Sequence, residues 1–145
     1  MADSEEKLDT QEAIERLNAA LELQLRSSLQ YSITAASLVG IEAQALGAKL
    51  TEFGDDELRD ARLLIEKIVS FEGEPTTKVA ELRFEPAVRD SLGWLIECEK
   101  AAVETLQEAI EPTGREGRSE ALEHLMEHLI LRKQHQVDFL SRAIS

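Results

Sequence analysis

The sequence has few of the residues that interrupt helices. Its 145 residues include seven glycines, three prolines and only 4% aromatic residues. Ala, Leu, Glu and Arg, which are good helix formers, are frequent instead. The composition therefore predicts an all-α protein, and the length suits one domain with a sizeable core.

Basic charge and cysteine are scarce as well. Sixteen Lys and Arg residues stand against 29 Asp and Glu residues, which gives a formal net charge of −13. A chain this acidic is expected to bind neither nucleic acid nor an anionic membrane. The single cysteine, Cys98, cannot form a disulfide within the chain, which fits a reducing compartment.

Long apolar runs are absent. No run approaches the roughly 20 residues that a membrane-spanning helix needs. Residues 1–8 are acidic and contain no apolar segment, so they do not form a signal peptide. We expect a soluble cytoplasmic protein, with a flexible acidic leader at 1–8 and one domain at 9–145.

Four segments repeat apolar residues at spacings of three and four, the signature of amphipathic helices. Capping residues, Gly and Pro set their ends at about 10–40, 43–71, 86–110 and 119–144. Gly54 falls inside the second segment and could mark a kink. Four long helices in one chain predict a four-helix bundle.

The stretch at 73–85 is the longest one without a helical pattern. Fully extended, it reaches about 43 Å, while a helix of about 28 residues is ~42 Å long. It can therefore cross the whole bundle and start the third helix at the far end, with Leu82 and Phe84 pinning it to the surface. A loose loop is the alternative.

Each apolar seam is interrupted near its middle by a polar residue: Gln24, Glu57, Glu99 and Lys133. In a bundle these four side chains should meet at one depth. A buried charge is costly unless it is paired or holds a metal. The seams therefore indicate either an ion-pair network or a metal site.

Two hypotheses follow for this depth of the bundle. In the first, Lys133 replaces a metal and neutralises Glu57, Asp60 and Glu99, and the amides Gln24 and Gln136 complete the network. In the second, Glu57, Asp60 and Glu99 bind a divalent cation, or a dinuclear iron site survives. A charged lysine has no lone pair and repels a cation, which favours the first.

Three histidines form a separate feature of the last segment. At 100° per residue, His124, His128 and His135 lie within about 40° of one another and roughly opposite Lys133. They are expected on a solvated or subunit-interface stripe. Surface metal binding through His124 and His128, four residues apart, is the alternative.

Several motifs resemble those of the bacterioferritins. They are LNAALELQLRSSLQY at 17–31, ELRDARLLIEKIVSFEGEP at 57–75, ETLQEAI at 104–110 and VDFL at 137–140. The resemblance covers most of the chain. It implies a ferritin-like four-helix bundle with a long crossover between the second and third helices, and a family function of iron oxidation.

The resemblance also carries over the positions of the iron ligands. They fall on Gln24, Glu57, Asp60, Glu99, Lys133 and Gln136. Only Glu57 and Glu99 keep the ligand type of the family. Moving the last helix by one residue would place His135 on the position of the family's histidine ligand. It would also place Arg132 on the position of the family's glutamate ligand.

Other family features are absent from the sequence. The haem-binding methionine falls on Leu58, so no haem is expected. The family's fifth helix has no counterpart before Ser145, so a dimer is expected rather than a complete cage. The predicted function is that of a ferritin-like bundle that has lost ferroxidase activity, has no cofactor and plays a structural or interaction role. The alternative is a bacterioferritin-like metal-binding or ferroxidase protein that uses iron or another divalent metal.

Overall fold

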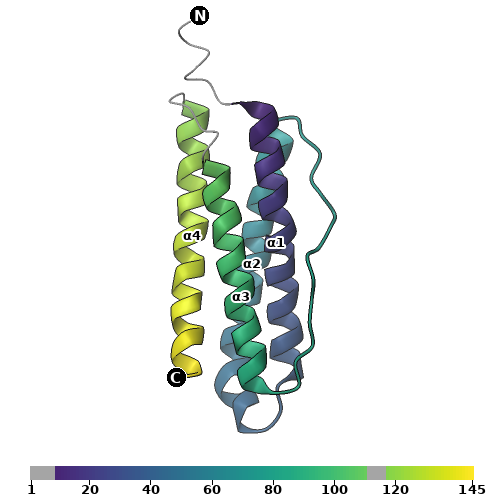
Figure 1. Ribbon diagram of the computed structural model, residues 1–145, viewed down its shortest axis with the longest axis vertical. Helices are drawn as coiled ribbons and strands as arrows, with labels where there is room; N and C mark the ends of the chain where they lie inside the picture. Colours follow the sequence, from purple (N-terminus) through teal and green to yellow (C-terminus); the bar gives the residue numbers. More distant parts are fainter. Residues whose placement is uncertain (1–8, 111–116) are drawn as a thin grey trace, which may run out of the picture.

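The computed structural model describes residues 9–110 and 117–145, which form a four-helix bundle (Figure 1). The predicted leader at 1–8 lies outside the described residues. The helices, in chain order, are α1 (Thr10–Ser37), α2 (Ile41–Ser70), α3 (Val88–Ile110) and α4 (Gly117–Ala143). The described part of the chain contains no strand, so the all-α bundle fold is confirmed.

Helix α1 begins where the sequence predicts. The side chain of Asp9 accepts a hydrogen bond from the backbone N–H of Glu12 at 3.1 Å. This bond satisfies one of the free donors at the helix start, and the Glu12 carboxylate there favours the helix dipole. The helix gives way at Leu38 to extended backbone, and a short turn through Gly40, with φ of 77°, leads into α2.

Helix α2 continues through Gly54 as one element. A Cβ atom added at Gly54 would lie 3.1 Å from the Cβ of Tyr31 in α1. The missing side chain therefore lets the two helices approach closely at this position. Helix α2 ends after Ser70, where Glu72 takes a positive φ of 65° and the N–H of Gly73 bonds back to the carbonyl of Ile68 at 2.9 Å.

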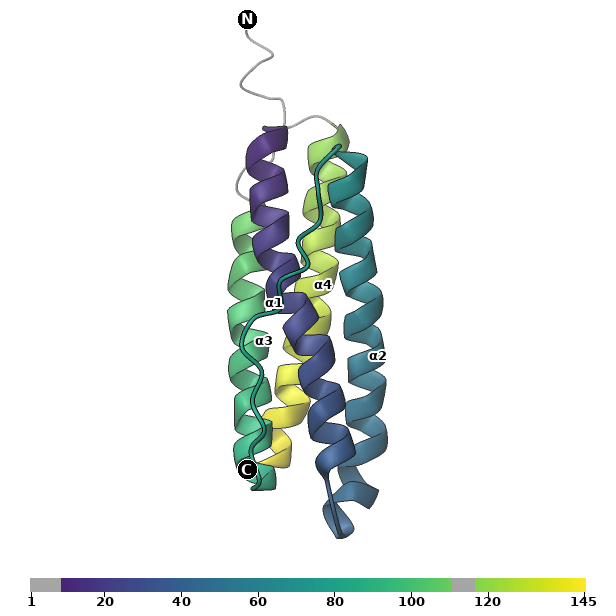
Figure 2. The same cartoon turned by 90° about the vertical axis from the view of Figure 1, so that its right-hand side faces the viewer.

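The crossover segment, residues 73–87, runs along the outside of α1 from one end of the bundle to the other (Figures 1 and 2). Polar contacts hold it there. Asn18 donates to the carbonyl of Glu74 at 3.0 Å and accepts from the N–H of Thr76 at 2.8 Å. The predicted apolar anchors were wrong, because Leu82 and Phe84 are 37% and 67% exposed.

The buried apolar residues form two clusters, one toward each end of the bundle. One contains Leu17, Leu64 and Met126, and the other contains Tyr31 and Leu95. Residues 24, 57, 99 and 133 lie between them along their helices. None of the described helices is long and apolar enough to cross a membrane.

Candidate functional site

A layer of buried polar side chains separates the two apolar clusters. Gln24, Glu57, Glu99 and Lys133 are 0% exposed and Gln136 is 1% exposed. We call these five residues the polar layer. Helices α1, α2 and α3 each supply one of them and α4 supplies two, because the seam of each helix turns its polar interruption inward at one depth.

Lys133 is the centre of the polar layer. Its Nζ donates to Glu57 Oε2 at 2.7 Å and to Glu99 Oε1 at 3.0 Å. Both contacts are short, charge-assisted hydrogen bonds between fully buried groups. One ammonium group from α4 thus joins the carboxylates of α2 and α3.

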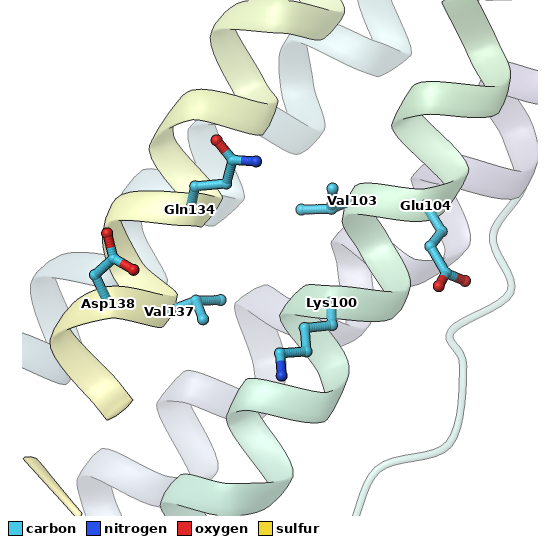
Figure 3. A pocket seen from close by; sticks show the side chains of 6 residues that line it. All are labelled: Lys100, Val103, Glu104, Gln134, Val137 and Asp138. Carbon is cyan, nitrogen blue, oxygen red and sulfur yellow. The ribbon is translucent and has the colours of Figure 1, made fainter. Parts of the chain in front are cut away.

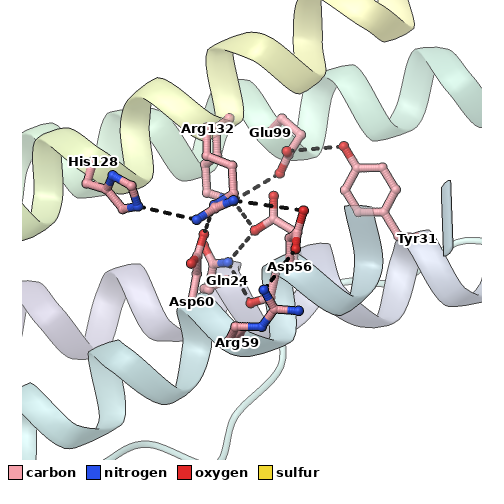
Figure 4. Close-up of polar contacts among 10 residues, drawn as sticks. Gln24, Tyr31, Asp56, Arg59, Asp60, Glu99, His128 and Arg132 are labelled. Carbon is pink, nitrogen blue, oxygen red and sulfur yellow. Dashed lines mark hydrogen bonds and ion pairs between the residues drawn. The ribbon is translucent and has the colours of Figure 1, made fainter. Parts of the chain in front are cut away.

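Other donors also contact the two carboxylates. Gln24 Nε2 donates to the Glu57 carbonyl at 2.9 Å and also to Glu57 Oε2. Tyr31 Oη donates to Glu99 Oε2 at 3.1 Å (Figure 4). With its amide nitrogen facing the carboxylates, Gln136 donates to Glu57 Oε1 and Glu99 Oε2, each at 2.5 Å. Tyr31 was not among the site residues predicted from sequence. Its position on the α1 seam, seven residues after Gln24, was the available signal.

The charges of the polar layer are unequal. Burial lowers the pKa of Lys133, but the nearby Glu57 and Glu99 outweigh this effect and the pKa is raised overall. Burial and the Glu99 charge raise the pKa of Glu57 well above its usual range, although Lys133 opposes them. Lys133 therefore stays charged, and the raised pKa of Glu57 favours the protonated form of its carboxyl group. Burial, followed by the Glu99 charge, also raises the pKa of Tyr31, which keeps its hydroxyl protonated as a donor.

Asp60 lies beside the polar layer but pairs with a different cation. Its side chain is buried, and Arg132 Nε lies 2.9 Å from its Oδ2 as an ion pair. The predicted neutralisation by Lys133 is replaced by this contact. Burial raises the pKa of Asp60, and the Arg132 charge opposes that rise.

Arg132 connects Asp60 to the surface. It lies 3.9 Å from Asp56, which also pairs with Arg59 at 3.4 Å, and its Nη2 lies 3.3 Å from His128 Nε2 (Figure 4). Arg132 was not predicted to take part in the site. Its interactions depend on the rotation of α4 relative to α2, which the sequence pattern does not specify to a single residue.

The position of α4 decides between the two registers considered from sequence. Lys133 and Gln136 face the core, whereas His135 is exposed. The histidine stripe, His124, His128 and His135, is exposed along its length. Within the described ranges, no three or more His, Cys, Asp or Glu side chains are grouped so as to hold a metal. Metal binding by the stripe stays a prediction.

A surface groove lies between α3 and α4 (Figure 3). Val103 and Val137 form its apolar part. Its other lining residues are polar: Lys100, Glu104, Gln134 and Asp138. Several of them neighbour residues of the polar layer in sequence, but these four polar side chains are exposed on the outer face. The groove is therefore separate from the polar layer.

The donor set of the polar layer does not fit a dinuclear metal centre. The Lys133 ammonium group bonds to a carboxylate oxygen of both Glu57 and Glu99, and a charged lysine offers no lone pair to a metal. The remaining members, Gln24 and Gln136, are neutral amides. Two carboxylates are too few to hold two metal ions, and the third nearby carboxylate, Asp60, is paired with Arg132.

Comparison with known proteins places this arrangement in context. Residues 14–145 match the family described as "Ferritin: Ferritin-like domain". No curated protein sequence matches the chain.

Solved structures with the same architecture are numerous. A ferritin-like, diiron-carboxylate protein from Bacillus anthracis is 26% identical, with a TM-score of 0.87 over 94% of this chain and 98% of that one. Rhodobacter capsulatus bacterioferritin, described with a metal-free dinuclear site and haem iron, is 27% identical, with a TM-score of 0.81 over 95% and 86% of the two chains. A dodecameric thioferritin from Bacteroides fragilis is 20% identical, with a TM-score of 0.83 over 94% and 86%, and supports the fold alone.

Proposed function

The chain belongs to the ferritin-like family, and from this premise we propose that it is a bundle protein without ferroxidase activity. In this proposal Lys133 occupies the place that metal ions take in iron-oxidising relatives. The observation that carries it is the pair of contacts from Lys133 Nζ, at 2.7 Å to Glu57 and 3.0 Å to Glu99. The polar layer then has a structural role, and the protein acts through its assembly or its surface.

The chemistry of iron oxidation supports this proposal. Transfer of electrons from two Fe(II) ions to dioxygen needs anionic and imidazole ligands that hold both ions in both oxidation states. The polar layer offers two carboxylates, one of which takes up a proton readily, and one fixed positive charge. That charge repels an incoming cation.

Metal analysis combined with an oxidation assay tests the proposal. Protein purified without a polyhistidine tag is expected to contain no stoichiometric iron, zinc or manganese. It should also oxidise Fe(II) in air no faster than buffer alone. Two tightly bound metal ions per chain together with rapid oxidation would overturn the proposal.

A Lys133→Glu variant tests the same idea from the opposite direction. It removes the cation and adds a third carboxylate beside Glu57 and Glu99. We expect lower stability without metal and a higher affinity for divalent cations, measured as the rise in melting temperature on adding Mn²⁺ or Zn²⁺. Lys100→Glu, at an exposed position of α3, is the matched control and should show neither effect.

The second candidate function is a metal-binding or ferroxidase protein that uses iron or another divalent cation at Glu57, Asp60 and Glu99. Two similar structures favour it: one is a diiron-carboxylate protein, and the other is a bacterioferritin with a dinuclear site that is metal-free in that structure. It requires that Lys133 and Arg132 leave their partners when metal arrives. The metal analysis separates the two candidates, because only this one predicts bound metal in the wild-type protein.

We further propose that the protein self-associates as a dimer in the cytoplasm, without nucleic acid, membrane or haem as partners. The dodecameric assembly described for the Bacteroides fragilis relative supports self-association. Leu58, at the position of the haem-binding methionine in the family, is 43% exposed and lacks a thioether. Size exclusion coupled to light scattering measures the mass of the assembly, and an absorbance scan of the same sample tests for haem.

A further inference from the structure

One buried arginine forms no direct ion pair with any of the described residues. Arg26 in α1 is 8% exposed. Within residues 9–110 and 117–145 no carboxylate forms an ion pair with it, and its Nε is buried without a hydrogen-bond partner. Buried charges are normally paired, because an unpaired one loses the free energy of hydration without compensation.

The surroundings of Arg26 contain a second arginine. The Arg26 Cζ lies 5.3 Å from the centre of the Trp94 ring, and the Arg83 Cζ lies 3.9 Å from the same centre. Cation–π attraction to the indole ring offsets part of the repulsion between the two guanidinium groups. It supplies no negative charge.

Hydrogen bonds fix this arrangement. Gln30 accepts from the N–H of Arg83 at 3.0 Å and from Trp94 Nε1 at 2.9 Å, and it donates to the carbonyl of Arg83 at 2.8 Å. The crossover segment is thereby held where its arginine stacks on the ring. The second guanidinium group is therefore placed by the fold.

Acidic side chains of the crossover segment lie near the two arginines. Glu81 forms an exposed pair with Arg83 at 2.9 Å, and hydrogen bonding and charge from Arg83, with a smaller effect of Arg26, lower the pKa of Glu81. Glu85 also acts on Arg83. Burial raises the pKa of the Cys98 thiol to about 11, while Arg26 and Arg83 both act to lower it. Both guanidinium groups therefore act on the same buried region of a chain whose overall charge is −13.

We propose that Arg26 and Arg83 bind a small oxyanion of the phosphate class beside Trp94. Guanidinium groups bind such oxygens in pairs through their planar N–H forks. The oxyanion supplies the direct ion pair that Arg26 lacks and bridges α1 to the crossover segment. Glu81 competes with the oxyanion for Arg83.

Trp94 makes the site directly observable, because it is the only tryptophan in the chain. The probe is inorganic phosphate, titrated at constant ionic strength against sodium chloride while tryptophan fluorescence is recorded. We expect a saturable change with phosphate and none with chloride. A change that follows ionic strength alone, or an equal response to acetate, would overturn the proposal.

Four variants locate the binding site. Arg26→Gln is expected to raise the apparent Kd for phosphate about tenfold or more, the loss of one charge-assisted contact. Arg83→Gln should weaken binding less, because Arg83 is partly engaged by Glu81. Glu81→Gln should tighten binding a few-fold. Arg62→Gln, at an exposed site on α2, should change nothing.

The variants on the crossover segment keep the test decisive if Arg26→Gln does not fold. Arg83 and Glu81 are largely exposed in this part of the chain, so their substitution leaves the bundle core intact. Opposite changes in phosphate affinity for Arg83→Gln and Glu81→Gln support the site. Equal affinities in these two variants and the wild type would refute it.

Discussion

Replacing Lys133 with methionine tests the polar layer most directly. Methionine has a similar length and no charge, so the substitution removes the cation with little change in volume. Both carboxylates that Lys133 contacts are 0% exposed. Removing one partner of a buried ion pair costs about 3–5 kcal/mol, because the remaining charge is left uncompensated. With two partners lost here, we expect a loss in the upper part of that range.

The loss should depend on pH, with a sign set by Glu57. The pKa of Glu57 in the folded protein is raised above its usual value of 4.5. Glu57 therefore contributes most to stability below pH 4.5, and this contribution is lost as the pH rises towards the pKa of the folded state. Lys133 limits this fall by lowering the pKa. Without Lys133 the pKa rises further, and the deficit of the variant should grow from pH 5 to pH 8.

Urea unfolding followed by circular dichroism at both pH values measures the effect. Lys100→Met, at an exposed lysine on α3, is the matched control and should stay within about 0.5 kcal/mol of wild type. The double variant Lys133→Met with Glu57→Gln should recover part of the loss. A cost for Lys133→Met below about 1 kcal/mol at pH 8 would refute the ion-pair reasoning.

The remaining predictions concern the polar layer and two glycines of α2. Glu57→Gln should cost less stability at pH 8 than at pH 5 in urea unfolding, because the raised pKa of Glu57 makes the wild-type protein lose stability over this range; a cost that grows with pH would contradict this. Tyr31→Phe removes a buried hydrogen bond to Glu99 and should cost about 1.5–3 kcal/mol by the same assay, with no loss if the bond is absent. Gly54→Ala should destabilise by about 1–3 kcal/mol, because its Cβ meets that of Tyr31 at 3.1 Å. Gly47→Ala, with no atom within 4 Å of the new methyl group, should raise the melting temperature and stabilise by about 0.5–1 kcal/mol.

Periodicity alone predicted most of the bundle and the centre of its polar layer. Seams with spacings of three and four place Gln24, Glu57, Glu99 and Lys133 inward, and all four are buried. This works because an inward-facing position on a long helix depends only on the helical repeat. The reach of residues 73–85 predicted the crossover, and the resemblance to bacterioferritins implied the same topology.

Contacts at the edges of helices were not predictable in the same way. Asp60 follows Glu57 by three residues and is also buried, yet its partner is Arg132 rather than Lys133. These two cations are neighbours in sequence, and a small rotation of α4 decides which of them meets Asp60. Periodicity does not determine a rotation of that size.

The crossover segment shows a second limit of sequence reasoning. Its apolar residues were expected to hold it, but Phe84 is 67% exposed. Asn18 and Gln30 hold it instead, through bonds to its backbone. Any segment offers backbone donors and acceptors, so its sequence carries no signal for such partners.

The polar layer also fixes how the helices are aligned along the bundle axis. Apolar seams tolerate sliding, because one leucine fills the place of another after a shift of one turn, 5.4 Å. A shift of that size would carry Lys133 away from Glu57 and Glu99, now 2.7 and 3.0 Å from it. Two buried carboxylates would then face an apolar side chain. The lysine thus selects a single alignment of α4 against α2 and α3, as one polar position selects the register of a coiled coil.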